Sequence, residues 1–166
     1  MSEPRLLRRP ELWLAAVIVL LDQVTKMVVL RTIALHGTVE VVPGLLNLTH
    51  VQNTGAAFGL LNDVHFPGKS VVVVVIALGA LAAIGVMGLR LATTAPLRLA
   101  IGLVLGGAVG NLIDRATMGY VIDFVDAYWR DWHFWAFNVA DAAITVGTIV
   151  MLLDFRRMGS HVPSPV

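Results

Sequence analysis

Two aspartates, Asp123 and Asp141, are the residues of this sequence best suited to acid–base chemistry. Asp123 lies in the segment Gly-Tyr-Val-Ile-Asp-Phe, and Asp141 follows Phe-Asn-Val-Ala at the start of a long apolar run. An ionisable side chain at such a position costs about 2.5–3.5 kcal/mol on membrane-insertion scales, so it is retained where it has a partner or a function. Neither acid has an obvious basic partner nearby in the sequence. Two carboxylates with one shared task indicate water activation, as in an aspartyl hydrolase.

The sequence contains little other hydrolytic machinery. It has no cysteine, and none of its serines stands in a nucleophile-elbow context. The histidines are scattered, with no His-Glu-x-x-His pattern of a zinc protease; they are His36, His50, His65, His133 and His161. We therefore expect carboxylates to carry the chemistry, without a metal or a cofactor.

Further polar residues lie at the ends of the apolar runs. Asn111, Asp114 and Arg115 stand three and four residues apart, so on a helix they share one face. Asn138 and Asp141 are also three residues apart. Paired charges and amides can also simply tie helices together. For Asp114 and Arg115, where the arginine can neutralise its neighbour or a nearby acid, both interpretations stay open.

Asp22 and Lys26 form a similar pair inside the first apolar run. They are four residues apart with the acid first, which is the better orientation for an ion pair on a helix. The pair can tie helices together or support a site, and both interpretations stay open.

Composition predicts a membrane protein. The chain is 57% hydrophobic and 14% charged, with a mean hydropathy of +0.81, whereas soluble domains are about 45–50% apolar and about 25% charged. Its 166 residues accommodate about four spanning helices of ~20 residues. We predict one integral membrane domain over residues 1–166, with spans at about 12–30, 71–89, 97–113 and 136–153. The net charge of +1 and the absence of a basic run argue against a nucleic-acid partner.

The arginines predict an orientation. They precede the first span, bracket the loop between the second and third, and follow the fourth; they are Arg5, Arg8, Arg9, Arg90, Arg98, Arg156 and Arg157. By the positive-inside rule both termini face the cytoplasm, and the two longer loops, with Asp123, face outward. The basic, then apolar N-terminus resembles a secretory signal, but Asp22 and Lys26 favour a retained helix.

The outward loops carry their own structural signals. Val39, Val41, Leu46 and Leu48 alternate on either side of Pro43-Gly44, which indicates a hairpin or small sheet. The mixture of small and apolar residues over 54–66 suggests a surface-lying helix. A later cluster is either an aromatic belt at the lipid headgroups or a substrate contact; its members are Tyr128, Trp129, Trp132, Phe134, Trp135 and Phe137.

Glycines recur at helical spacing in the third span. Gly102, Gly106, Gly107 and Gly110 can form a dimer face or let helices pack closely within one chain. We favour packing within one chain, and we expect a monomer.

Five polar blocks, taken in order, resemble those of bacterial lipoprotein signal peptidase (signal peptidase II). The resemblance extends from the first span to the fourth, without a departure at a polar motif position. The blocks are Asp22-Gln23-Val24-Thr25-Lys26, Asn53-Thr54-Gly55-Ala56-Ala57-Phe58, Gly106-Gly107-Ala108-Val109-Gly110-Asn111-Leu112-Ile113-Asp114-Arg115, Val121-Ile122-Asp123-Phe124 and Phe137-Asn138-Val139-Ala140-Asp141.

The resemblance implies an all-α membrane protein of four transmembrane helices with a small extracytoplasmic β-sheet and a surface-lying helix. It implies an intramembrane aspartyl endopeptidase of the bacterial inner membrane, which cuts prolipoproteins before a diacylglyceryl-modified cysteine and is the target of globomycin. Asp123 and Asp141 would be the catalytic pair. The residues expected to bind substrate or support the site are Asp22, Lys26, Asn53, Gly55, Asn111, Asp114, Arg115, Asn138 and Ala140.

A second function class stays open from the residues alone. A small ion- or proton-coupled transporter also uses intramembrane carboxylates. The polar residues gather toward one face of the membrane and no repeated half is visible, which favours the hydrolase.

Overall fold

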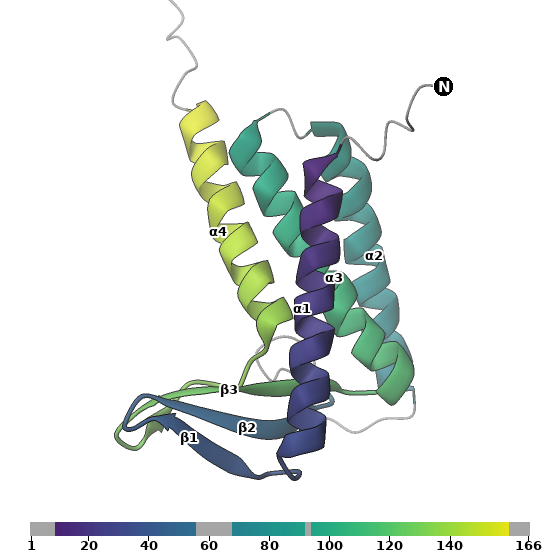
Figure 1. Cartoon of the computed structure of the whole chain (residues 1–166). Helices are drawn as coiled ribbons and strands as arrows, with labels where there is room; N and C mark the ends of the chain where they lie inside the picture. The colour runs from purple at the N-terminus through teal and green to yellow at the C-terminus, as the bar shows by residue number, and fades with distance from the viewer. Residues whose placement is uncertain (1–8, 56–67, 92–93, 160–166) are drawn as a thin grey trace, which may run out of the picture.

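The computed structural model describes residues 9–55, 68–91 and 94–159. Four long helices stand side by side, and a small antiparallel sheet lies across one end of them (Figure 1). In chain order the elements are α1 Pro10–Thr32, β1 Thr38–Val42, β2 Leu46–Asn53, α2 Lys69–Leu91, α3 Ala95–Met118, β3 Val121–Trp129, β4 Trp132–His133 and α4 Val139–Gly159. Each predicted span thus corresponds to one helix, and the predicted hairpin is β1–β2.

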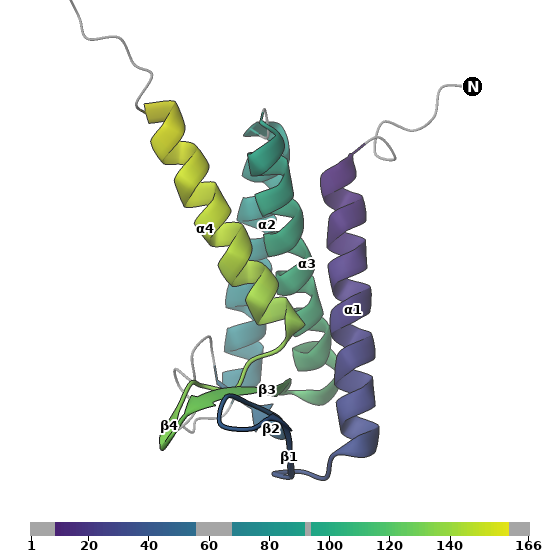
Figure 2. The ribbon, with the colours of Figure 1, turned by 60° about the vertical axis from the view of Figure 1, so that its left-hand side comes forward.

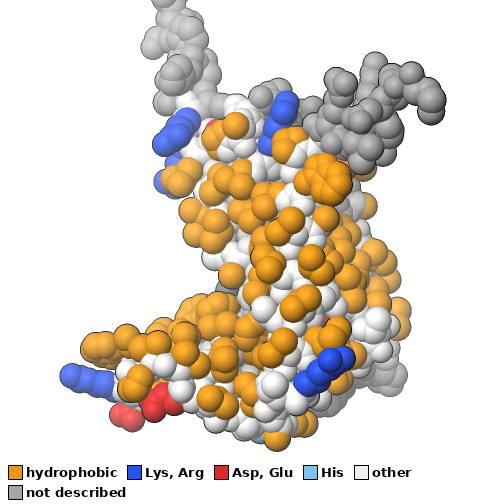
Figure 3. Space-filling view, viewed as in Figure 1, with side chains coloured by type: hydrophobic (Ala, Val, Ile, Leu, Met, Phe, Trp, Pro, Cys, Tyr) orange, Lys and Arg blue, Asp and Glu red, His pale blue; other side chains and the backbone are white. Residues whose placement is uncertain are grey.

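The exposed surfaces of the helices are apolar, as in a membrane protein. In α1 the buried residues are Glu11, Asp22, Lys26 and Val29, whereas Leu20 is 63% exposed. Such an inside-out pattern stabilises a helix in lipid but not in water. Apolar side chains cover much of the visible helical surface, with Lys and Arg toward its ends (Figure 3). By length and composition, α1 and α3 are long and apolar enough to cross a membrane.

Glycines let α3 pack closely against two other helices. A Cβ at Gly106 would lie 2.8 Å from the carbonyl O of Ala15 in α1, and a Cβ at Gly107 would overlap the carbonyl O of Ala140 in α4. Only a residue without a side chain allows backbones to approach so closely. The glycines therefore pack within one chain, as the sequence analysis favoured.

The sheet has the order β1-β2-β3-β4 and is antiparallel throughout. Its longest strand, β3, falls in a segment that the sequence pattern predicts as a loop. Residues 121–124 are all buried, so this strand lacks the alternation by which half-buried strands are recognised. In its register Val51 of β2 lies opposite Asp123, and Asn53 lies opposite Val121.

All four helices extend beyond the predicted spans at one or both ends, and the differences are largest in α3 and α4. α3 continues past residue 113 and ends at Met118; its capping residue is Gly119, whose φ of 80° is left-handed and suits a glycine. α4 begins at Val139 and not at 136, because Phe137 exchanges backbone hydrogen bonds of 2.8 and 3.0 Å with Val125 of β3. The predicted surface-lying helix over 54–66 falls mostly outside the described residues.

Candidate active site

The two aspartates meet where β3 passes beneath the start of α4. Asp123 is the third residue of β3, and Asp141 lies in the first turn of α4. The view in Figure 2 shows α4 descending to the sheet beside β3. The side chain of Asp123 is 2% exposed. The fold thus brings together two acids that are separated by the aromatic hairpin β3–β4.

Asn138 joins the two acids. Its amide Nδ2 donates to Asp123 Oδ1 at 2.7 Å, and its Oδ1 accepts from the backbone N–H of Asp141 at 2.9 Å. Its own backbone N–H donates to Asp141 Oδ2 at 3.3 Å. This reciprocal pair of bonds at a helix start is the arrangement that caps a helix. The cap of α4 therefore also fixes the relative position of the two carboxylates.

Two further amides hold the remaining carboxylate oxygens. Asn111 Nδ2 donates to Asp141 Oδ1 at 2.8 Å, and Asn53 Nδ2 donates to Asp123 Oδ2 at 2.9 Å. Each of the four carboxylate oxygens thus accepts a hydrogen bond. Within the described ranges, no ion pair joins either acid to a basic group. Neutral donors orient the acids without neutralising them.

The pKa of Asp123 is raised from its ordinary value to about 7. Burial is the largest cause, and the nearby charge of Asp141 adds to it. Hydrogen bonds from Asn53 and Asn138 and the charge of Lys26 oppose the shift in pKa and only partly offset it. Asp123 can therefore hold or release a proton near neutral pH, which is what an acid–base catalyst requires.

A buried charged cluster lies directly behind the acids. Lys26 Nζ is 2.7 Å from Asp22 Oδ2 and 2.9 Å from Asp114 Oδ2. The ion pair of Asp114 is with Lys26, while Arg115 interacts electrostatically with Asp141, Asp123 and Asp114. The described residues contain no group of three or more His, Asp or Glu arranged to hold a metal ion.

Arg115 supports the loop that follows β2. Its Nη2 donates to the carbonyl O of Gly55 at 3.1 Å, and its Nη1 donates to the carbonyl O of Asn111 at 3.3 Å. The backbone N–H of Gly55 in turn donates to Asn53 Oδ1 at 2.9 Å. Arg115 therefore helps to hold Asn53, the amide that contacts Asp123.

Two donor groups of the site, the side chain of Gln23 and the backbone N–H of Ile122, are not predicted from the sequence. Gln23 Nε2 donates to Asp114 Oδ1 at 2.9 Å and to the carbonyl O of Gly110 at 3.2 Å. The backbone N–H of Ile122 donates to Asp114 Oδ2 at 3.2 Å. A polar Gln23 inside an apolar run is a signal for the first contact; no sequence pattern indicates the second.

The aromatic cluster lies around the β3–β4 hairpin. Trp129, Trp132 and Trp135 are 61%, 65% and 66% exposed, while Phe134 packs edge-on against Phe137 at 6.0 Å between ring centroids. Such exposed indoles fit a belt at the lipid headgroups, which stays a prediction.

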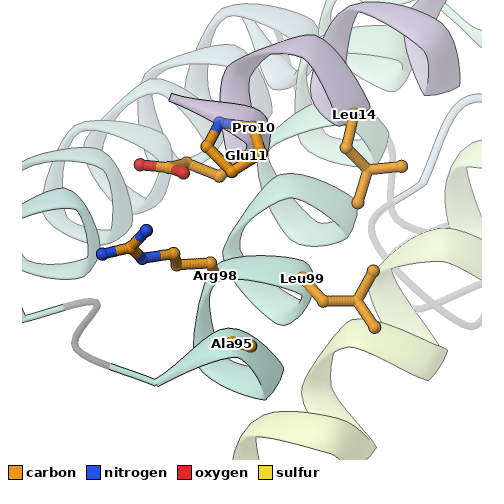
Figure 4. Close-up of a pocket in the computed structure, with 6 residues that line it drawn as sticks. All are labelled: Pro10, Glu11, Leu14, Ala95, Arg98 and Leu99. Atoms are coloured by element: carbon orange, nitrogen blue, oxygen red, sulfur yellow. The ribbon is translucent and has the colours of Figure 1, made fainter. Parts of the chain in front are cut away.

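A hollow of about 540 Å³ lies at the opposite end of the bundle, between the starts of α1 and α3 (Figure 4). It is lined by Pro10, Glu11, Leu14, Ala95, Arg98 and Leu99. None of these residues belongs to the acid pair or its amide donors.

Comparison with known proteins gives a consistent result. A family model described as signal peptidase (SPase) II matches residues 14–157. The lipoprotein signal peptidase of Symbiobacterium thermophilum is 46% identical over 146 residues, covering 84% of this chain and 90% of that protein. That of Geobacter metallireducens is 43% identical over 143 residues, covering 86% and 87%. A solved bacterial membrane enzyme is 32% identical, with a TM-score of 0.83 over 95% of this chain and 93% of its own.

Proposed function

The chain belongs to the signal peptidase II family, and from this premise we propose that it is an aspartyl endopeptidase whose catalytic pair is Asp123 and Asp141. The observation that carries the proposal is the shared partner Asn138, which donates to Asp123 and caps the helix turn that holds Asp141. Burial and mutual repulsion favour one shared proton for such a pair.

The proposed substrate is a prolipoprotein whose cysteine already carries diacylglycerol. The enzyme removes the signal peptide by cutting the peptide bond before that cysteine. Each methylene in the bilayer contributes about 0.8 kcal/mol to membrane binding, so two acyl chains keep the precursor at the membrane. The lipid thus delivers the scissile bond to a site near the membrane surface.

The hydrolysis proceeds in two proton-balanced steps. The ionised carboxylate takes a proton from water as the water oxygen bonds to the scissile carbonyl carbon, while the protonated carboxyl gives its proton to the carbonyl oxygen. In the second step one hydroxyl returns a proton to a carboxylate, and the other carboxyl protonates the leaving nitrogen as the C–N bond breaks. The products are a carboxylic acid and an amine, and the pair again shares one proton.

The amides Asn53, Asn111 and Asn138 have a defined part in this scheme. They donate to the carboxylate oxygens, so they stabilise the ionised member and keep its free lone pairs directed at the water. Preorganised donors of this kind need no rearrangement during the reaction.

We further propose that all four helices cross the inner membrane, with both termini in the cytoplasm. Arg156 and Arg157 end α4 at the side away from the sheet, as the positive-inside rule requires. The acids then lie near the outward-facing side of the inner membrane, and the sheet lies at the surface of that membrane on the same side. The transporter alternative has no support, because the family model and the relatives that match the chain are signal peptidases, and the acid pair with its amide donors lies at the sheet end of the bundle.

The decisive experiment compares precursor cleavage by four purified proteins in lipid nanodiscs. Asp123→Asn and Asp141→Asn should each lose several decades of rate, because an amide can neither deprotonate water nor share a proton. Asp126→Asn is the matched control, since Asp126 lies on the same strand but pairs with His133 at 2.9 Å, and it should retain the activity of the wild type.

The same assay tests the substrate. A precursor without diacylglycerol should not be cleaved. Near-normal turnover by either acid variant would refute the aspartyl mechanism, and equal cleavage of the two precursors would refute lipid recognition.

A further inference from the structure

The ammonium of Lys26 is the centre of the buried charged cluster. It is 2% exposed and donates to Asp22 Oδ2 at 2.7 Å, to Asp114 Oδ2 at 2.9 Å and to Asn111 Oδ1 at 3.0 Å. An ammonium has three N–H donors and no acceptor. All three donors are therefore used within the protein, and each ends on a different residue.

Two of these partners continue to the residues that precede the catalytic acids. Asp22 Oδ1 accepts the backbone N–H of Ala140 at 2.9 Å, one residue before Asp141. Asp114 Oδ2 accepts the backbone N–H of Ile122 at 3.2 Å, one residue before Asp123. One cation thus holds both carboxylates that fix the backbone next to the acid pair.

The third partner is Asn111, whose orientation Lys26 determines. Because an ammonium cannot accept a hydrogen bond, the amide must present its Oδ1 to Lys26. Its Nδ2 is then left to donate to Asp141 Oδ1 at 2.8 Å. A reversed amide would place NH₂ against the ammonium and oxygen against a carboxylate, two repulsive contacts in a buried site.

The same orientation extends to Asn138. Its Nδ2 donates to Asn111 Oδ1 at 3.2 Å as well as to Asp123 Oδ1 at 2.7 Å. The donor side of Asn138 is therefore directed at both groups, and its Oδ1 is left to cap α4.

We infer that Lys26 is a positioning residue of the catalytic site, which sets the placement of Asp123 and Asp141 through Asp22, Asp114 and Asn111. This inference rests on the proposed function of the acid pair. Lys26 does not act on the substrate, because its donors all end on protein groups.

The charge of Lys26 also affects the pH dependence of the reaction rate, which can be measured separately from kcat. Charged groups that interact with Asp123 are Asp141 from α4, Arg115 from α3 and Lys26 from α1, and Lys26 itself is flanked by Asp22 and Asp114. Loss of the ammonium removes a positive charge that lowers the pKa of Asp123. The pH–rate profile should therefore move to higher pH.

The test measures kcat, KM and the pH profile of Lys26→Met with a diacylglyceryl precursor in nanodiscs. Methionine keeps most of the length of the side chain without its charge. We expect kcat to fall about 100-fold, the effect of a displacement of about 1 Å at a catalytic group, with KM unchanged and the pH–rate profile moved to higher pH. Wild-type kcat with an unmoved pH profile would overturn the inference.

Gly102→Ala is the matched control for mere loosening of α1 against α3. A Cβ at Gly102 would lie 2.8 Å from the carbonyl O of Glu11 in α1, at the end of the bundle away from the acid pair. The kcat of this variant should stay within about threefold of wild type at a comparable loss of melting temperature. Equal kcat losses in Gly102→Ala and Lys26→Met at equal thermal stability would show that only helix anchoring is lost, and would overturn the inference.

If Lys26→Met does not fold, a double variant in which the buried charges stay balanced is compared with a single variant. Lys26→Met/Asp114→Asn removes one buried cation and one buried anion, and Asp114→Asn alone is its reference. The double variant should have a kcat at least about tenfold below the single variant; equal values would overturn the inference. Asp123→Asn is assayed alongside, and turnover by that variant would refute the acid pair and not the role of Lys26.

Discussion

Replacement of Asp123 by asparagine should remove activity and, at the same time, remove a pH-dependent loss of stability. The pKa of Asp123 is about 7 in the folded protein, against an ordinary value of 3.8. The folded protein therefore holds a proton that the unfolded chain releases between these two values. Stability must fall as pH rises through this window, because the native state binds more protons than the unfolded state.

The size of the effect follows from the same two values. With one pKa unit equivalent to about 1.4 kcal/mol, the penalty for Asp123 is roughly 2 kcal/mol at pH 5 and roughly 4 kcal/mol at pH 8. The difference of roughly 2–3 kcal/mol corresponds to about 5–10 °C in melting temperature for a chain of this length. An asparagine side chain does not titrate, so the Asp123→Asn variant should lack this part of the pH dependence.

The measurement is thermal unfolding in detergent, followed by tryptophan fluorescence from pH 5 to pH 8. Asp123→Asn also disturbs hydrogen bonds with Asn53 and Asn138, but that cost is independent of pH and cancels in the comparison of the two curves. Asp131 lies in the exposed turn after β3, so Asp131→Asn is the control. Its melting temperature should depend on pH in the same way as that of wild type. Parallel curves for wild type and Asp123→Asn would refute a raised pKa at this position.

Three further predictions concern packing, the site and topology. Gly107→Ala should destabilise the protein by about 1–3 kcal/mol in denaturant unfolding, because its methyl group overlaps the backbone of α4; Gly79→Ala, with open space at the Cβ position, should not. Asn53→Ala should move the pH–rate profile to higher pH, because the donor that lowers the pKa of Asp123 is lost; an unchanged profile would contradict this. Cysteines at Asp131 and Arg156 should be labelled in intact cells by an impermeant reagent only at position 131, and labelling only at 156 would invert the topology.

Features that depend on local residue patterns could be predicted from the sequence. Long apolar runs predicted the four helices, and alternation around Pro43-Gly44 predicted the first hairpin. Asn138 and Asp141 were placed on one face from their spacing alone. These features are local, so a linear pattern contains them.

Contacts between distant segments were not predictable in the same way. Lys26 and Asp114 lie far apart in the chain, and their ion pair depends on how closely α1 and α3 approach. The backbone donors of Ile122 and Ala140 carry no side-chain signal at all. β3 escaped recognition because burial of residues 121–124 removes the alternation that distinguishes a strand.

The long-range contacts also determine when the enzyme becomes active during its synthesis. Asp22 of the first helix bonds Ala140 at the start of the last helix across 118 positions, and Asn53 reaches Asp123 across 70 positions. A chain is synthesised from its N-terminus, so the proposed catalytic pair is complete only after α4 has been made. Products truncated before α4 lack Asp141, so we expect them to have no peptidase activity.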